Sequence, residues 1–123
     1  MIKYHETYDK KWFLKDSKLM FEQDGNIYEA KNSEELDLLH PSDMCVGIIG
    51  DGCGGGRIFI ADTGHKMIKV YEPETAEVFV IMQDLNSPKS INKSACILSI
   101  ETKVKGEIVE FDLSSMTKTI KQI

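Results

Sequence analysis

A cluster of glycines in the middle of the chain constrains the fold more than any other feature. Residues 50–56 read Gly-Asp-Gly-Cys-Gly-Gly-Gly and stand between two apolar runs, residues 45–49 and 58–61. Glycine adopts positive φ without steric penalty, so such a segment favours a turn. The run that follows is rich in β-branched and aromatic residues, which favour strands. The sequence therefore predicts a strand, a glycine turn and a second strand.

The glycine spacing also has to be tested against phosphate-binding motifs. Gly50, Gly52 and Gly55 fit the pattern G-x-G-x-x-G, but that motif must open a helix, whereas a strand is predicted after Arg57. No Lys-Ser or Lys-Thr pair follows the glycines, which excludes a P-loop. We expect a structural turn, with an anion-binding nest of backbone N–H groups as the alternative role. The glycines of this turn are Gly50, Gly52, Gly54, Gly55 and Gly56.

The residues before the glycines predict a hairpin and a short helix. Asp24-Gly25 supplies a two-residue turn between strands at 18–23 and 26–30. Asn32 or Ser33 is expected to cap a helix that ends before Pro41.

The residues after the glycines predict a series of β-strands. Runs at 67–71, 77–82, 95–100 and 107–113 are apolar or alternating and are separated by turn residues. Residues 117–123 predict either a last strand or a short helix.

Length and composition predict one folded domain covering residues 1–123. A chain of 123 residues with 41% hydrophobic and 28% charged residues has an ordinary globular balance. The expected fold class is α+β and β-dominated, with a curved, mainly antiparallel sheet and one or two short helices; the alternative is an all-β fold.

Charge is distributed unevenly along the chain. The formal net charge is −5, which disfavours nucleic acid as a partner. Residues 19–56 carry eight carboxylates against the single base Lys31. Such a block can steer a basic protein partner into contact, although a solvated surface is the stronger explanation for any single carboxylate.

Apolar stretches and cysteines indicate the compartment. The longest apolar stretches, such as residues 78–82, are far shorter than the roughly 20 residues of a membrane span, and the N-terminus is polar. Cys45, Cys53 and Cys96 do not make a dense disulfide framework, so a reducing cytoplasm is expected, with no membrane contact.

Candidates for chemistry have stronger structural explanations. Cys53 lacks an evident base, although His40 or His65 could approach it, and a small cysteine in a turn is commonly a packing residue. These residues and Cys45 lack the C-x-x-C or H-x-x-x-H spacing of a zinc site. We expect no metal and no cofactor.

Two further patterns invite a functional interpretation. Asp51 and Asp62 flank the predicted glycine strand and could form a carboxylate pair, but aspartate commonly caps turns. Aromatic residues alternate with lysines over residues 3–15, as in binders of single-stranded nucleic acid, but packing of the aromatics on the sheet is the stronger explanation. We expect no catalytic residue and therefore a protein that is not an enzyme.

One weak internal similarity links distant segments. Residues 56–62 and 106–112 share a glycine, alternating apolar residues and a closing aspartate, about 50 residues apart. Propeller blades repeat at a comparable period, but two strands that end in an Asp turn explain the similarity as well.

The central segment resembles domains of the SUKH superfamily. Residues 48–62, Ile-Ile-Gly-Asp-Gly-Cys-Gly-Gly-Gly-Arg-Ile-Phe-Ile-Ala-Asp, followed by Val70-Tyr71-Glu72, are similar to the family's I-G-D-x-G-G-G strand and V-Y strand. Upstream, residues 26–30 and 33–36 are similar to its short strand and E-E-L helix.

The resemblance implies a fold and a function. SUKH domains are α+β, with helices against a curved sheet, and many bacterial members are immunity proteins that neutralise a toxin, often a nuclease. It implies a bacterial or phage inhibitor that masks a basic toxin domain with an acidic face. The expected partner contacts are Glu34, Glu35, Asp37, Asp43 and Asp51.

A second resemblance leads to another function. Residues 57–73 look like an NHL-type propeller repeat, and a propeller needs four or more blades, so the chain would have to assemble from subunits as a homo-oligomer. The alternative function is a small-molecule or nucleotide-binding module, either a single chain or an oligomer. It would use the loop at residues 50–56 as an anion nest.

Overall fold

The computed structural model describes residues 4–50 and 52–123, and its described residues are mostly in β-strands. They form three four-stranded antiparallel sheets, each with its strands in chain order. The first sheet contains β1 (His5–Thr7), β2 (Lys10–Lys15), β3 (Lys18–Gln23) and β4 (Asn26–Glu29). The second contains β5 (Asp43–Val46), β6 (Ile58–Asp62), β7 (Met67–Glu72) and β8 (Glu77–Met82). The third contains β9 (Pro88–Ser94), β10 (Ile97–Thr102), β11 (Glu107–Asp112) and β12 (Thr117–Gln122).

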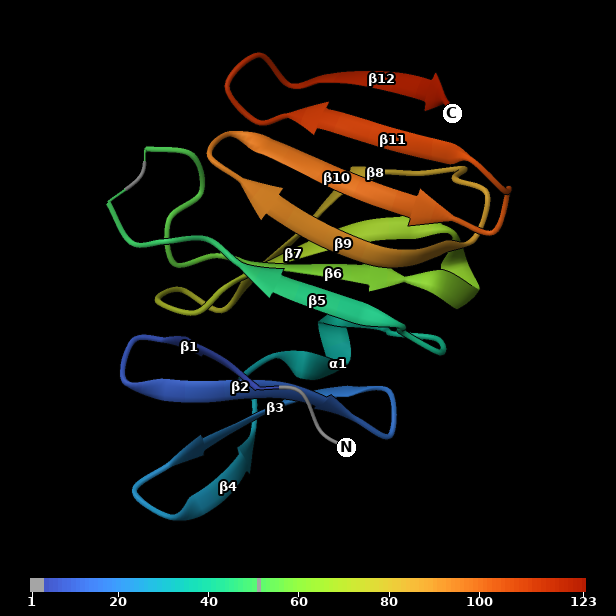
Figure 1. Ribbon diagram of the computed structural model, residues 1–123. Helices are drawn as coiled ribbons and strands as arrows, with labels where there is room; N and C mark the ends of the chain where they lie inside the picture. The colour runs from blue at the N-terminus through green and yellow to red at the C-terminus, as the bar shows by residue number, and fades with distance from the viewer. Residues whose placement is uncertain (1–3, 51) are drawn as a thin grey trace.

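The three sheets stack face to face in chain order, with the second sheet in the middle (Figure 1). Two short helices, α1 (Ser33–Leu36) and the 3-10 helix η1 (Thr63–His65), lie in connections. The predicted dominance of antiparallel β-structure is confirmed, and the all-β alternative describes the fold well. The expected single curved sheet is replaced by three separate sheets, because the connections at residues 30–42 and 83–87 interrupt the strand pairing.

The second and third sheets repeat one another. β7 begins at Met67 and β11 at Glu107, while β8 begins at Glu77 and β12 at Thr117, so the offset is 40 residues. Four-stranded sheets of this kind are the unit that propellers repeat. The similarity between residues 56–62 and 106–112 does not mark this repeat, because it aligns β6, a second strand, with β11, a third strand.

Two apolar clusters hold the sheets together. Between the first and second sheets, Trp12 packs 5.9 Å from the ring of Tyr71, and Leu19 and Leu36 are completely buried. Between the second and third sheets lies a larger cluster, whose members include Phe59, Val70, Leu98, Ile100 and Phe111. Burial of these side chains from water is the main stabilising contribution to the stack.

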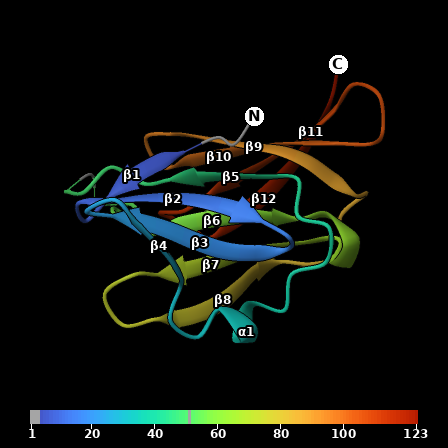
Figure 2. The same ribbon diagram turned by 90° about the horizontal axis from the view of Figure 1, so that it is seen from below.

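Polar contacts join the sheets near the first strand of each sheet. β5 lies beside both β1 and β9 (Figure 2). The Asp43 carboxylate accepts the N–H of Ile91 at 3.0 Å, and the hydroxyl of Ser42 donates to the carbonyl of Pro88 at 3.2 Å. These hydrogen bonds fix the second sheet against the third.

The local predictions before the glycine loop have mixed outcomes. Asp24 and Gly25 both have positive φ between Gln23 and Asn26, which confirms the hairpin. The short helix is present with Asn32 at its N-cap, as predicted, but the expected side-chain capping bond is absent. Asn32 makes no side-chain capping bond and instead donates from Nδ2 to the carbonyl of Ala76 at 3.2 Å.

Within the described residues, the structure has no helix that is both long and apolar enough to span a bilayer.

Candidate functional site

An open groove with a volume of about 670 Å³ lies between the second and third sheets. One side is formed by β6, β7 and β8, and the other by the turn between β11 and β12. Residues 52–55 of the glycine loop close one end.

The groove continues the core cluster out to the surface. Phe59, Val70 and Phe79 are paired neighbours across β6, β7 and β8, so their side chains share the face that points at the third sheet. Phe59 and Val70 are buried, whereas Phe79 is 36% exposed. Across the groove, Leu113 packs against the same cluster and Met116 is 59% exposed. A ligand in the groove would therefore contact apolar groups on both sides.

One ion pair lies in the groove among these apolar groups. Nε of Arg57 lies 3.4 Å from Oε1 of Glu72, and the Arg57 guanidinium carbon lies 5.4 Å from the centre of the Phe79 ring. The side chain of Arg57 is 45% exposed and that of Glu72 is 16% exposed. The guanidinium is therefore the more accessible charge of the pair.

The glycine loop connects two paired strands, which confirms the predicted strand–glycine–strand arrangement. The loop bonds to itself: the N–H of Gly56 donates to the carbonyl of Gly47 at 2.9 Å, and that of Arg57 donates to the carbonyl of Gly54 at 3.0 Å. The first strand is shorter than predicted. It ends at Val46, and Ile48 and Ile49 are exposed because the chain leaves the sheet at Gly47.

A disulfide between Cys53 and Cys96 ties the glycine loop to the turn between β9 and β10. The sequence did not predict this bond. The bond also removes the Cys53 thiolate that a nucleophilic role would need. Cys45 is buried in the core cluster and is not part of this disulfide.

The predicted acidic contacts that the structure describes lie in two different places. Glu34, Glu35 and Asp37 are exposed at α1, within one helical turn and its C-cap. Asp43 is half-buried, and its carboxylate accepts the N–H of Ile91, so it serves the packing of the second and third sheets. Asp51 lies outside the described residues.

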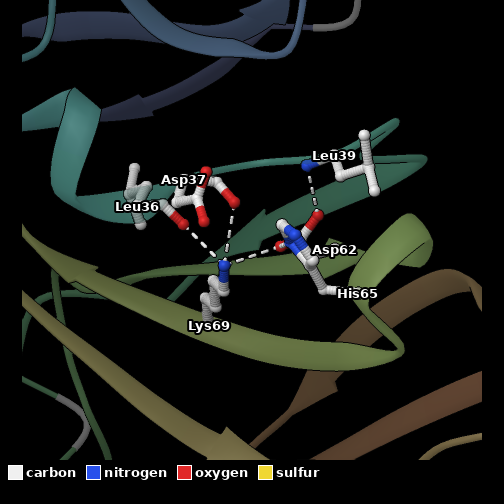
Figure 3. A network of polar contacts seen from close by, with 6 residues as sticks. All are labelled: Leu36, Asp37, Leu39, Asp62, His65 and Lys69. Atoms are coloured by element: carbon white, nitrogen blue, oxygen red, sulfur yellow. Dashed lines mark hydrogen bonds and ion pairs between the residues drawn. The ribbon is translucent and has the colours of Figure 1, made fainter.

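Asp62 anchors a polar network between the second sheet and the segment from Leu36 to Leu39 (Figure 3). Its carboxylate is completely buried, lies 2.7 Å from Nδ1 of His65 and 2.8 Å from Nζ of Lys69, and accepts the N–H of Leu39 at 2.8 Å. Lys69 also donates to the carbonyls of Leu36 at 2.6 Å and Asp37 at 3.0 Å. These partners give Asp62 a structural role.

The apolar side chains of the groove were not predicted from the sequence. Phe79 lies in the run Val-Phe-Val-Ile-Met, which is apolar on both faces of the strand and so differs from an ordinary half-buried strand. Such a run indicates apolar side chains on both faces of the strand, and the exposure of Phe79 follows only from the packing of the sheets. Met116 carries no comparable signal, because only the packing of the two sheets places it at the groove.

Among the described residues no group of three or more His, Cys, Asp or Glu side chains is arranged to hold a metal ion.

Comparison with known proteins gives information about the fold alone. No family model matches the chain, and no curated protein matches it. Among solved structures, the chain is similar to one described as the crystal structure of the tricorn protease, with a TM-score of 0.66 and 11% sequence identity. The match covers 96% of this chain but only 11% of that protein. At this identity the likeness concerns the fold alone.

Proposed function

We propose that the chain is a binding module and that the groove between its second and third sheets is the ligand site. The observation that carries this proposal is the row from Phe59 through Val70 to Phe79, which extends the apolar core into an open groove. Ligand sites in proteins are concavities of roughly 300–1,000 Å³ with mostly apolar walls and a few polar groups. The volume of the groove lies in this range, and its lining combines apolar side chains with the backbone of the glycine loop and the charged groups of Arg57 and Glu72.

The surrounding structure supports this assignment because it holds both sides of the groove in place. The shared apolar cluster fixes the second sheet against the third, and the Cys53–Cys96 disulfide ties the loop at the end of the groove to the third sheet. A rigid site loses little conformational entropy when a ligand binds.

The test is a thermal-shift screen of small molecules, nucleotides and short peptides, followed by two matched variants. Met116→Glu places a charge in the groove, whereas Ile120→Glu places a charge on β12, outside the groove. The two side chains are similarly exposed, Met116 at 59% and Ile120 at 56%. A ligand of the groove is expected to lose about tenfold or more in affinity with the first variant and almost none with the second. Equal effects of the two variants would contradict the proposal.

A second candidate is the inhibitor function that the SUKH resemblance implies. In this proposal the chain is a bacterial or phage immunity protein, not an enzyme, that masks a basic toxin domain. The exposed carboxylates of Glu34, Glu35 and Asp37 support it, because they share one short segment and can steer a basic protein. Reversal of these three charges should slow association with the toxin encoded by a neighbouring gene at low salt; an unchanged rate would exclude this face.

The compartment belongs to the same proposal and can be tested separately. An immunity protein of this kind would act in the cytoplasm, where a disulfide such as Cys53–Cys96 is normally kept reduced. Alkylation of thiols in freshly lysed cells should then label Cys53 and Cys96. Protection of both cysteines from alkylation would indicate an oxidising compartment instead.

A further inference from the structure

The groove carries an accessible positive charge at the end that the glycine loop closes. Arg57 forms its ion pair with Glu72 through Nε. A guanidinium has four further N–H donors on its two terminal nitrogens. These donors match a carboxylate in a bidentate arrangement. The Phe79 ring beneath the guanidinium holds Arg57 at the groove.

The backbone of the glycine loop favours the same kind of ligand group. Gly52, Gly54 and Gly56 have φ of +78°, +76° and +81°, while the residues between them lie outside the left-handed region. Glycines at positive φ are the backbone from which an anion-binding nest is built. The N–H groups of Gly56 and Arg57 already donate to the carbonyls of Gly47 and Gly54, so the loop's donors for an anion would come from the residues before Gly56. Gly54 and Gly55 line the groove together with Arg57, so an anion at Arg57 lies beside the loop backbone.

The strand beside the groove offers a backbone edge. β8 ends the strand order of the second sheet, so one of its edges has no partner strand within the described sheet. Between Val78 and Met82 this strand carries no charge, whereas the edge strand β12 carries Lys118 and Lys121, which protect an edge against pairing. An extended peptide can add to such an edge through main-chain hydrogen bonds. A fatty acid shares the carboxylate and the apolar chain of the proposed ligand, but it has no backbone amides to form these bonds.

From these three features we propose that the groove binds the carboxyl-terminal end of an extended peptide whose last side chains are apolar, an inference that rests on the proposed ligand site. The terminal carboxylate meets Arg57 and the glycine loop. The last side chains lie between Phe79 and Met116, and the peptide backbone runs along β8.

The test uses fluorescence anisotropy with a fluorescein-labelled peptide that ends in Val-Leu-Phe. The free-carboxylate form is expected to bind about tenfold more tightly than the same peptide with a terminal amide. Arg57→Gln should remove this difference. Lys89→Gln, which changes the net charge equally on the third sheet, should preserve it. Decanoate, which lacks a peptide backbone, should compete only at about tenfold higher concentration.

The outcomes separate this inference from the proposed function. Equal binding of acid and amide, or competition by decanoate as strong as that by the peptide, would overturn the peptide assignment. If neither peptide binds, but Met116→Glu weakens the binding of another ligand, the groove is a ligand site and the peptide assignment is wrong. If no ligand responds to Met116→Glu, both fail.

Discussion

The carboxylate of Asp62 and the ammonium group of Lys69 form a buried ion pair, with 2.8 Å between Oδ2 and Nζ. The Asp62 side chain is completely buried and that of Lys69 is 8% exposed. The pair also bonds the backbone of Leu36, Asp37 and Leu39, so it fixes the segment that joins the first sheet to the second.

Removal of one partner from this pair should be costly. Lys69→Met leaves a buried carboxylate without its cation and should lower the free energy of unfolding by about 3–5 kcal/mol. Lys18→Met breaks an exposed pair with Glu29 and should cost about 0–1 kcal/mol. Urea denaturation measures both values. Equal losses would show that the network contributes no more than a surface ion pair.

The disulfide should contribute substantially to stability. Cys53 and Cys96 are 43 residues apart, and closing a loop of that size in the unfolded chain stabilises the fold by about 4 kcal/mol in the chain-entropy description. Reduction by dithiothreitol should therefore lower the melting temperature of the wild type. The Cys53→Ser/Cys96→Ser variant should melt at that lower temperature with or without the reductant. A wild type that does not respond to reduction would argue against the bond.

Gly56 tests the contact between the glycine loop and the first sheet. Its φ is +81°, and an added Cβ would lie 2.5 Å from the Tyr8 hydroxyl oxygen. Gly25 has a φ of +82° with open space around it, so Gly25→Ala measures the backbone strain alone. Strain should cost both alanine variants about 1 kcal/mol. The clash is with the far end of the Tyr8 side chain, which can turn away, so Gly56→Ala should lose only about 1 kcal/mol more, through the displaced Tyr8 contact. Equal losses in urea denaturation would show that Tyr8 does not pack on the loop.

Tyr71 should make stability depend on pH in the alkaline range. Burial raises the pKa of its phenol above 10.0, and its hydroxyl donates to the carbonyl of Lys31 at 2.6 Å. The folded chain then holds the proton more tightly than the unfolded chain, so this stabilisation is present below pH 10 and is lost as pH rises through the folded pKa. Tyr8, whose pKa is raised by burial and by a hydrogen bond with Glu74, acts in the same direction.

Tyr71→Phe should lose about 1 kcal/mol at neutral pH, because the hydrogen bond to Lys31 is removed. Above pH 10 its stability should fall less steeply than that of the wild type. Tyr28→Phe, at an exposed position, is the control. Denaturation series from pH 8 to 12 measure the slopes, and parallel curves for Tyr71→Phe and the wild type would contradict the role of Tyr71.

Most strands were predictable because their signals are local. The hairpin around Asp24-Gly25, the strand that begins at Met67 and the one that begins at Glu77 follow from turn residues and short apolar runs. β9 was missed, because Pro88 marks a break in the pattern, yet this residue is the first of the strand. Proline is tolerated there because the first residue of a strand need not donate to the sheet.

The arrangement of the sheets and the groove could not be predicted in the same way. The division into three sheets depends on which strands pair. The 40-residue repeat appears when the strands of the second and third sheets are aligned, and Glu72 and Asp112 then occupy equivalent positions. Each of these two carboxylates accepts the N–H of the residue two positions on, Glu74 and Ser114. The disulfide and the placement of Phe79 and Met116 on one groove require two sheets to pack in register, which no short pattern encodes.

The most direct test of the ligand site is an amide chemical-shift titration of the ¹⁵N-labelled chain with the peptide that ends in Val-Leu-Phe. We expect the largest shift changes at Gly54, Arg57, Phe79 and Met116, on both sides of the groove. Largest changes at Glu34 to Asp37, or within β1 to β4, would contradict it.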